Sequence, residues 1–298
     1  MKVIPITPRG YCPGVVKAID IVNKAVADPR IPRPIYILGM IVHNRFVVDD
    51  FTTKGVITLS SPGKTRLELL DLIDSGTVII TAHGTEDAVI AKIRAKGLHL
   101  INATCKDVQK THDLIKDYLS DGFDVLFIGK KGHPETEGAM GIGASVRLIE
   151  TLADIDSLGP LALKLFVTNQ TTLSLKDLDQ LLTVLKSKYP QAVISDEICN
   201  STRIRQEALL TFNQAVDLCL VIGDPHSNNS QSLAKLSQIE TKTDTRLIES
   251  LEDLDIGWLK DVETISVTSG ASTPTAITTA VIDYLKRFDA ADPATWKK

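Results

Sequence analysis

The chain has 298 residues, 43% of them hydrophobic, and a formal net charge of −4. A chain of this length can bury a large core and is expected to form two or three domains. The small acidic charge, without a run of lysines and arginines, argues against a nucleic-acid partner. The N-terminus reaches Pro5 and Pro8 without an apolar stretch, and the longest apolar runs fall far short of the roughly 20 residues that span a bilayer. We therefore expect a cytoplasmic protein without a membrane partner.

Along the chain, one order of elements occurs three times. Each copy begins with a short β-like run that ends near a cysteine, followed by a helix and by a second strand that ends in polar residues. A short third strand, an acidic stretch, a fourth strand and a closing helix follow. The helices after the cysteines are expected over residues 15–26, 106–119 and 203–216, and the second strands within residues 34–44, 124–134 and 218–229. Apolar strands that alternate with amphipathic helices are typical of parallel sheets covered on both faces.

This repeat predicts the fold class and the domain organisation. A period above 90 residues is too long for a solenoid. We therefore expect three similar small α/β domains with mostly parallel sheets, in a pseudo-threefold (trefoil) arrangement. The expected domains cover residues 1–105, 106–199 and 200–298, the last with a C-terminal tail. The strand before each cysteine can pair with either neighbouring domain, so the strand within residues 1–13 belongs to the first domain or to the third.

Three of the four cysteines mark the period. Cys12, Cys105 and Cys199 lie 93 and then 94 residues apart, each between a strand and a helix. Taken singly, each is more readily explained as a buried thiol than as a ligand, but the equal spacing and shared context favour one metal site. Three thiolates leave one corner of a tetrahedral or cubane site open, where chemistry can occur. Cys219 lies inside an apolar strand instead, and we interpret it as a structural thiol.

Polar residues gather after the second and fourth strands of the repeats. Because the carboxyl ends of parallel strands meet at one sheet edge, these residues are expected where ligands bind. They comprise three histidines, one carboxylate and short amide or hydroxyl side chains: His43, His83, His133, Glu135, Thr171, Ser227, Asn228, Asn229 and Ser272. Such donors suit an anionic group, especially a phosphate or a diphosphate.

Each of these residues also has a simpler structural explanation. A lone histidine at a strand end is as often a cap or a surface residue as a functional one, although three equivalent positions favour function. The Ser/Asn-rich and Thr-rich segments could serve only as turns and helix N-caps. Glu135 could be a first-turn carboxylate favoured by the helix dipole. His99 and His112 lie outside the equivalent positions and are expected to be incidental, while His226 stays open.

The motifs together resemble one known family. The segments "PRGYCPGVVKAI", "VHNRFVVD", "GKKGHPETEGAMG", "TNQTTLS" and "GAST" are similar, in the correct order and over nearly the whole chain, to those of the LytB/IspH family. The resemblance implies three α/β domains in a trefoil around one central 4Fe–4S iron–sulfur cluster. It places the cluster ligands at Cys12, Cys105 and Cys199 and leaves one iron open.

The resemblance also implies roles for the polar residues. The implied diphosphate-binding residues are His43, His83, His133, Ser227, Asn229 and Ser272. Glu135 would be the proton source, and the Thr171 hydroxyl would orient the substrate alcohol and relay the proton. Asn228 stands where the family commonly has serine, and we expect an amide or backbone contact to the diphosphate there. Asn169 stands where a threonine is common.

The implied activity is that of an iron–sulfur oxidoreductase. It is a two-electron reductive dehydroxylation of 4-hydroxy-3-methylbut-2-enyl diphosphate to isopentenyl and dimethylallyl diphosphate, the final step of the methylerythritol phosphate route to isoprenoids. No flavin or nicotinamide fingerprint is evident in the sequence, so the electrons are expected from ferredoxin or flavodoxin. Two other functions would use the same cysteines. A hydro-lyase would need no external electrons, and an iron–sulfur or zinc sensor would not need the histidines and Glu135.

Overall fold

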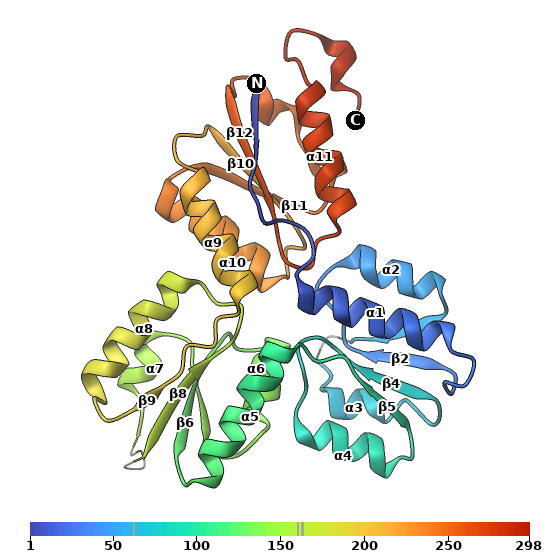
Figure 1. Cartoon of the computed structure of the whole chain (residues 1–298), viewed down its shortest axis with the longest axis vertical. Coiled ribbons are helices and arrows are strands. Elements are labelled where there is room, and N and C mark those ends of the chain that lie inside the picture. The colour runs from blue at the N-terminus through green and yellow to red at the C-terminus, as the bar shows by residue number, and fades with distance from the viewer. Residues whose placement is uncertain (62, 160, 162–163) are drawn as a thin grey trace. The chain divides into compact units, whose positions relative to one another are not determined.

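The computed structural model describes residues 1–61, 63–159, 161 and 164–298, and these residues form three four-stranded sheets (Figure 1). Every strand pair among them is parallel. The prediction of an α/β fold with three parallel sheets is therefore confirmed. None of the described helices is both long enough and apolar enough to cross a membrane.

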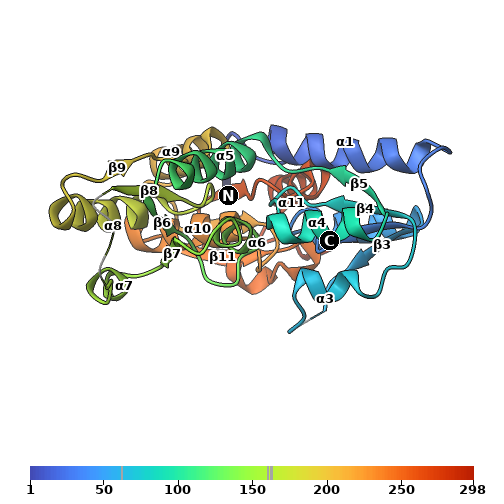
Figure 2. The same ribbon diagram turned by 90° about the horizontal axis from the view of Figure 1, so that it is seen from below.

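The first sheet has the strand order β3-β2-β4-β5. Its elements in chain order are α1 (Pro13–Ala27), β2 (Ile35–Leu38), α2 (Arg45–Thr53), β3 (Val56–Leu59), α3 (Arg66–Leu70), β4 (Thr77–Ile80), α4 (Asp87–Ala95) and β5 (His99–Asn102). Every residue of β4 is buried, as expected for an apolar strand that is covered on both faces. In agreement, α1 lies on one side of β4 and β5 and α3 on the other (Figure 2).

The second sheet has the strand order β7-β6-β8-β9. Its elements are α5 (Lys106–Ser120), β6 (Asp124–Ile128), α6 (Pro134–Met140), β7 (Val146–Ile149), α7 (Leu152–Asp156), β8 (Leu165–Asn169), α8 (Leu175–Lys188) and β9 (Val193–Ile194). Successive residues of β6 enter separate cores, because side chains alternate between the faces of a strand. Leu126 packs with α7 and α8, whereas Phe127 packs with α5 and α6.

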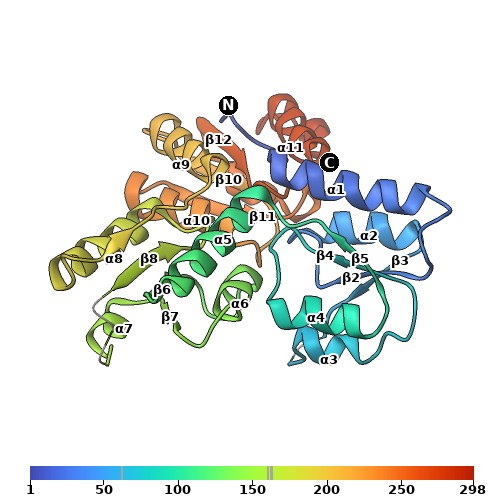
Figure 3. The same ribbon diagram turned by 60° about the horizontal axis from the view of Figure 1, so that its bottom comes forward.

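The third sheet has the strand order β1-β12-β10-β11. Its elements are β1 (Lys2–Pro5), α9 (Asn200–Phe212), β10 (Leu218–Ile222), α10 (Asn228–Leu236), the π-helix η1 (Ser237–Thr241), β11 (Asp244–Ile248), the 3-10 helices η2 (Leu251–Asp253) and η3 (Ile256–Leu259), β12 (Thr264–Ser269), α11 (Thr275–Arg287) and the 3-10 helix η4 (Pro293–Trp296). α9 and α11 flank β10 and β12 (Figures 1 and 3). Leu220 of β10 packs on the α11 side, and Cys219 on the side of α9 and α10.

The strand that precedes each cysteine lies at the edge of a sheet, next to a fourth strand. β1 pairs with β12, β5 with β4 and β9 with β8. β5 and β9 join the sheet that precedes them in the chain, whereas β1 comes from the N-terminus and completes the third sheet. Since each cysteine follows such a strand, its thiol is brought to the carboxyl edge of a parallel sheet, where ligands bind.

The chain packs into two compact units. The C-terminal unit comprises Met1–Pro13, His43–Phe46 and Asn200–Lys298, and it contains the third sheet. The two-sheet unit comprises Gly14–Val42 and Val47–Cys199. The short segment His43–Phe46 therefore separates from its neighbours in the sequence and joins the C-terminal unit.

The sequence pattern does not predict α2, α6 and α10, each of which follows a second strand. These helices are short, and they begin at or just after residues that the pattern assigned to a ligand site. His133 caps α6, where Pro134 occupies the first turn, and Ser227 caps α10 by accepting the N–H of Ser230. Capping and ligand binding use the same side chains, and the pattern alone does not separate the two roles.

The helices after the cysteines form as expected, but the third ends at Phe212 rather than at residue 216. Asn213 directs its side-chain amide to the hydroxyls of Ser237 and Thr241, at 2.7 and 2.8 Å. Ala215 has a φ of 57°, which an α-helix does not allow. A buried polar network thus ends the helix before its apolar pattern does.

Candidate functional site

The three repeat cysteines are fixed by the same backbone hydrogen bond. In each case the cysteine N–H donates to the carbonyl oxygen of the second residue after a fourth strand. The pairs and their N···O distances are Cys12 with Ala271 (2.9 Å), Cys105 with Ala82 (3.0 Å) and Cys199 with Thr171 (3.1 Å). This contact places each of the three repeat cysteines beside a loop that carries predicted site residues. The three repeats are therefore equivalent down to one backbone hydrogen bond.

The thiols lie in two kinds of surroundings. All four cysteines are among the described residues, and none of them forms a disulfide. Cys12, Cys105 and Cys199 are half-buried, whereas Cys219 is 0% exposed. Burial raises the pKa of the Cys219 thiol, which therefore stays protonated and is a poor ligand. Partly exposed thiols at the starts of helices are better suited to a metal or an iron–sulfur group.

The predicted ligands are divided between the two units. Cys12 belongs to the C-terminal unit, and Cys105 and Cys199 belong to the two-sheet unit. In the part of the chain that the structure describes, no three Cys, His, Asp or Glu side chains form a group that could hold a metal ion.

In the two-sheet unit, Glu135 and Thr171 form a buried pair. Glu135 is 2% exposed and Thr171 is 3% exposed. The Thr171 N–H donates to Glu135 Oε1 over 2.6 Å, and 3.1 Å separates the Thr171 hydroxyl oxygen from Glu135 Oε2. Thr171 is also the residue whose carbonyl oxygen accepts the Cys199 N–H. The structure therefore brings together a carboxyl, a hydroxyl and one predicted cluster ligand.

Burial raises the pKa of the Glu135 carboxyl to about 7. The two hydrogen bonds from Thr171 oppose this rise, and the nearby Asp107 carboxylate adds to it. Loss of hydration outweighs the two hydrogen bonds, because a charged carboxylate is poorly stabilised away from water. Near neutral pH Glu135 thus populates both protonation states, as a group that delivers protons must.

His83 and His133 lie next to each other in the same unit. Their ring centroids are 5.7 Å apart and their planes are nearly perpendicular. The N–H of Glu135 donates to His133 Nδ1 over 3.2 Å. Because Nδ1 accepts this hydrogen bond, the proton of the neutral His133 ring is assigned to Nε2. An imidazole N–H of this kind can donate to a phosphate oxygen.

His112, which lies outside the equivalent positions of the repeats, has a structural position. It is 5% exposed, and it packs against the glycines that follow His83 and Glu135. A methyl group on Gly84 would lie 3.0 Å from the His112 Cε1 atom, and one on Gly138 would lie 3.1 Å from it. Burial lowers the pKa of His112 to about 4, so the ring is neutral and serves to pack the two loops together.

Polar residues that the sequence analysis missed fix the loop before Cys199. The Glu197 carboxylate is buried, and it lies 2.9 Å from Lys110 Nζ and accepts the Ser195 hydroxyl over 2.6 Å. The Glu197 N–H donates to Asn169 Oδ1 over 3.1 Å. Lys110 lies on α5, so this network ties the helix of one repeat cysteine to the loop of another. The sequence alone does not reveal this network, because it joins residues that are far apart in the chain.

In the C-terminal unit, Ser272 contacts the loop of the first histidine. The Ser272 hydroxyl donates to the His43 carbonyl oxygen over 2.9 Å. The preceding residue, Ala271, accepts the Cys12 N–H and donates its own N–H to Asn229 Oδ1 over 3.0 Å. Four predicted site residues of this unit therefore belong to one small contact network.

Three predicted residues, one of them the Asn229 of this network, lie at the N-terminus of α10, and all are buried: Ser227, Asn228 and Asn229. Ser227 is the N-cap, and the amide of Asn229 also donates to Thr202 Oγ1 over 3.4 Å. The structural roles of turn and cap thus apply to Ser227 and Asn229. A helix N-terminus also presents backbone N–H groups and a partial positive charge, both of which favour an anion.

Arg205 is another site-supporting residue that the sequence analysis did not single out. Its buried guanidinium donates to the Gly10 carbonyl oxygen over 2.8 Å. Gly10 has a φ of 77°, and its N–H donates to Ser269 Oγ over 2.7 Å. A methyl group on Gly10 would lie 2.5 Å from Thr275 Oγ1. Glycine is therefore required for both conformation and space in the loop that leads to Cys12.

Sequence and structure comparisons identify the family. The sequence profile of the family described as "LytB protein" matches residues 3–286. The chain belongs to the LytB family. Its relative in Geobacillus sp. (strain WCH70), a 4-hydroxy-3-methylbut-2-enyl diphosphate reductase, is 50% identical, and the match covers 100% of this chain and 94% of the relative. The relative of the same name in Listeria monocytogenes serotype 4b (strain CLIP80459) is 48% identical, with 100% and 90% covered.

Two solved structures of similar proteins support membership of the LytB family. The E-1-hydroxy-2-methyl-but-2-enyl-4-diphosphate reductase from Plasmodium falciparum superimposes with a TM-score of 0.90 at 31% identity, covering 97% of this chain and 89% of the other. A second reductase, described as the terminal enzyme of the non-mevalonate pathway, gives a TM-score of 0.65 at 28% identity, covering 97% and 100%. The resemblance seen in the motifs is thus confirmed, and the LytB family is known for an iron–sulfur cofactor.

Proposed function

We propose that this LytB-family chain is an oxidoreductase that converts 4-hydroxy-3-methylbut-2-enyl diphosphate to isopentenyl and dimethylallyl diphosphate. The reaction is a two-electron reductive dehydroxylation, the final step of the methylerythritol phosphate pathway. Relatives that match the whole chain at 48–50% identity carry the name of this reductase. The observation that carries the proposal is the buried pair of Glu135 and Thr171, which joins an acid with a pKa of about 7 to the loop of Cys199.

One 4Fe–4S cluster would be held by Cys12, Cys105 and Cys199. The donor set fits such a group, because these three thiols are half-buried and share one backbone contact, whereas the fourth cysteine is buried in β10. Bound there, the cluster would supply electrons and an open iron that acts as a Lewis acid toward the allylic hydroxyl. The electrons would come from a small redox protein, ferredoxin or flavodoxin.

The substrate diphosphate would be bound by His43, His83, His133, Ser227, Asn228, Asn229 and Ser272. The Nε2–H of His133 and the Ser272 hydroxyl are suitable donors, and the N-terminus of α10 adds backbone N–H groups. Because the Asn229 amide already contacts Ala271 and Thr202, we expect Asn229 to act mainly by orienting its loop.

Glu135 would supply the protons for the reaction. Its neutral carboxyl can donate to the Thr171 hydroxyl, 3.1 Å from Oε2. That hydroxyl can at the same time donate its own proton to the substrate oxygen, which leaves as water. The low exposure of both residues keeps bulk water from this path.

Turnover by anaerobically reconstituted protein tests the proposed function. With dithionite-reduced methyl viologen as the electron source, the protein should convert the diphosphate to the two isoprenoid diphosphates. Omitting the reductant should stop the reaction. Loss of water from the diphosphate without reductant, to a product that is not reduced, would instead indicate a hydro-lyase, and a complete lack of reaction at full cluster content would indicate a sensor.

Ser272→Ala is expected to weaken binding of the substrate by about 1–3 kcal/mol, because it removes one charge-assisted hydrogen bond to the diphosphate. The dissociation constants of wild type and variant, measured at equal iron content, check this value. The unphosphorylated diol serves as the control, because it has no anionic group, so it should bind far more weakly and should not respond to Ser272→Ala. Equal affinities for the diol and its diphosphate would rule out the anionic pocket.

The kcat of the enzyme should fall as the pH rises through about 7. Glu135 can donate a proton only in its neutral form, and burial raises the pKa of Glu135 to about 7, so the neutral form is lost above that pH. The Thr171 hydroxyl lowers this pKa, so Thr171→Val, which also removes the relay and should lower kcat at every pH, should move the alkaline limb of the remaining activity to higher pH. Thr172→Val leaves the contacts of Glu135 intact and should not move it. A kcat that does not vary between about pH 6 and pH 9 would contradict this role.

A further inference from the structure

The loop that carries His43 belongs to the C-terminal unit, although the chain directly before and after it does not. Four residues, His43–Phe46, belong to that unit, while the chain up to Val42 and from Val47 belongs to the two-sheet unit. On both sides the covalent chain therefore continues in the two-sheet unit. The position of His43 within this unit depends on the contacts that hold the loop.

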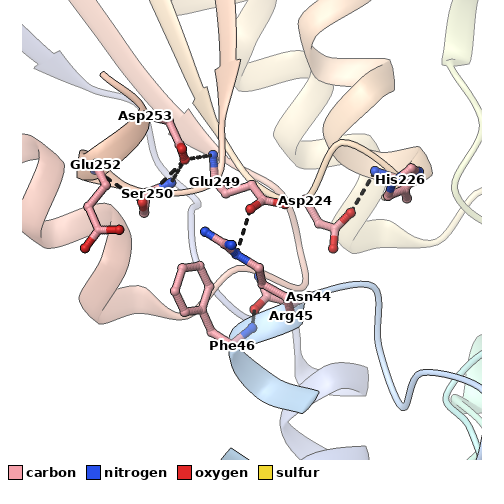
Figure 4. Close-up of polar contacts among 9 residues, drawn as sticks. All are labelled: Asn44, Arg45, Phe46, Asp224, His226, Glu249, Ser250, Glu252 and Asp253. Carbon is pink, nitrogen blue, oxygen red and sulfur yellow. Dashed lines mark hydrogen bonds and ion pairs between the residues drawn. The ribbon is translucent and has the colours of Figure 1, made fainter. Parts of the chain in front are cut away.

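A hydrogen bond and an ion pair are among the contacts that attach the loop to the rest of the C-terminal unit. The Ser272 hydroxyl donates to the His43 carbonyl oxygen over 2.9 Å. Two residues further along, Arg45 Nε lies 2.7 Å from Glu249 Oε2 (Figure 4). The first contact uses a predicted substrate-binding residue, whereas the second is an ion pair of two residues with no assigned role.

Both partners of the ion pair are oriented by their surroundings. The Arg45 guanidinium lies 4.9 Å above the ring centroid of Phe46. Glu249 directly follows β11, and the Asp253 carboxylate accepts the backbone N–H groups of Glu249 and Ser250, over 3.1 and 2.9 Å. The ion pair therefore joins a guanidinium that rests on a ring to a residue whose backbone is held, so less entropy is lost than in an ordinary surface pair.

The anchor at Glu249 lies beside the segment that leads into α10. The N–H of Gly223 donates to the carbonyl oxygen of Ile248 over 2.8 Å. In the next turn, Asp224 accepts the N–H of His226 over 2.7 Å, and the His226 side chain is exposed (Figure 4). The end of β11 thus supports both the turn before the N-cap serine and, through Glu249, the His43 loop.

We propose that Arg45 and Glu249 are positioning residues that keep His43 in the C-terminal unit while Ser272 binds the substrate diphosphate. This inference rests on the proposed function. A serine hydroxyl has one proton, and Ser272 donates it to the His43 carbonyl oxygen. The oxygens of an ionised diphosphate only accept hydrogen bonds, so a Ser272 hydroxyl that turns to the diphosphate releases this carbonyl. The ion pair of Arg45 and Glu249 does not involve the Ser272 hydroxyl and is therefore kept when that hydroxyl turns.

Arg45→Met and Glu249→Gln each remove the ion pair with little change in side-chain size. Each variant should raise the KM for the diphosphate about threefold to fivefold, the effect expected of a half-exposed ion pair, with kcat less affected and iron content unchanged. The double variant with both charges reversed, R45E/E249R, should bring the KM back toward the wild-type value. A purely steric role of either residue would not give this rescue.

Hydrogen exchange over residues 43–47 gives a readout that does not require turnover. With inorganic diphosphate as the probe, the exchange of this segment in Arg45→Met should be faster than in wild type, and the difference should be larger when the probe is present. Arg246→Met is the matched control, because it removes another ion pair on the same strand, 3.0 Å from Asp244, together with a guanidinium over the Trp258 ring.

Two results would overturn the role of Arg45 and Glu249. One is an Arg45→Met protein with the KM and the exchange of wild type or of Arg246→Met, and the other is a charge-reversed double variant no better than the single variants. A wild-type protein that does not turn over would instead contradict the proposed function, and the exchange experiment would still decide the role of the ion pair.

Discussion

Serine in place of Cys12, Cys105 or Cys199 is expected to abolish both the iron–sulfur cluster and turnover. Each thiolate would bind one iron, and a serine hydroxyl, which stays protonated at neutral pH, is a much poorer ligand. Anaerobically reconstituted wild-type protein should carry about four irons and four sulfides per chain, and each variant far fewer. Iron and sulfide analysis together with the visible absorption spectrum measures this loss.

Cys219→Ser is the matched control for these variants. Cys219 is 0% exposed in β10, and burial raises the pKa of its thiol, so it has no thiolate to offer at neutral pH. The Cys219→Ser protein should therefore bind as much iron as wild type. A stoichiometric zinc site in the wild-type protein would contradict the assignment of the three ligands. A loss of iron in Cys219→Ser equal to that in the other three variants would contradict it as well.

The fold could be predicted because its signals are local and periodic. A buried parallel strand such as β4 is a short apolar run, and a helix such as α5 shows its apolar residues at helical spacing. The even spacing of the repeat cysteines adds a second signal, which indicates that one supersecondary unit occurs three times. The same spacing separates Cys12, Cys105 and Cys199 from Cys219.

The supporting contacts of the site could not be predicted, because they join residues that are remote in the sequence. Lys110 and Glu197 are 87 residues apart, and nothing in either segment indicates that a buried carboxylate meets a lysine there. The pairing of Arg45 with Glu249 is of the same kind. The packing of His112 is a further case, since its ring lies against two glycines, Gly84 and Gly138, that are remote from each other in the sequence.

Glu135→Gln is expected to slow turnover by roughly 10²-fold or more, a typical loss when a general acid is removed. The substitution preserves shape, and the glutamine carbonyl can still accept the Thr171 N–H that now lies 2.6 Å from Oε1. A glutamine amide cannot, however, release and regain a proton near neutral pH. Iron content and substrate affinity should therefore stay close to those of wild type while kcat falls. Single-turnover measurements with the same electron donor separate this chemical step from binding.

Glu137→Gln provides the control on the same helix, because Glu137 is an exposed carboxylate in the first turn of α6. Both variants replace a first-turn carboxyl group by an amide at the same helix N-terminus, so a general effect of changing this turn would appear in both. Burial raises the pKa of Glu137 as well, but only Glu135 has the buried contact with Thr171, so only its variant should lose turnover. If Glu135→Gln turns over at a rate near that of wild type, Glu135 is not the proton source. His133, whose Nδ1 accepts the Glu135 N–H, would then be the first alternative, because its assigned Nε2–H could supply the proton.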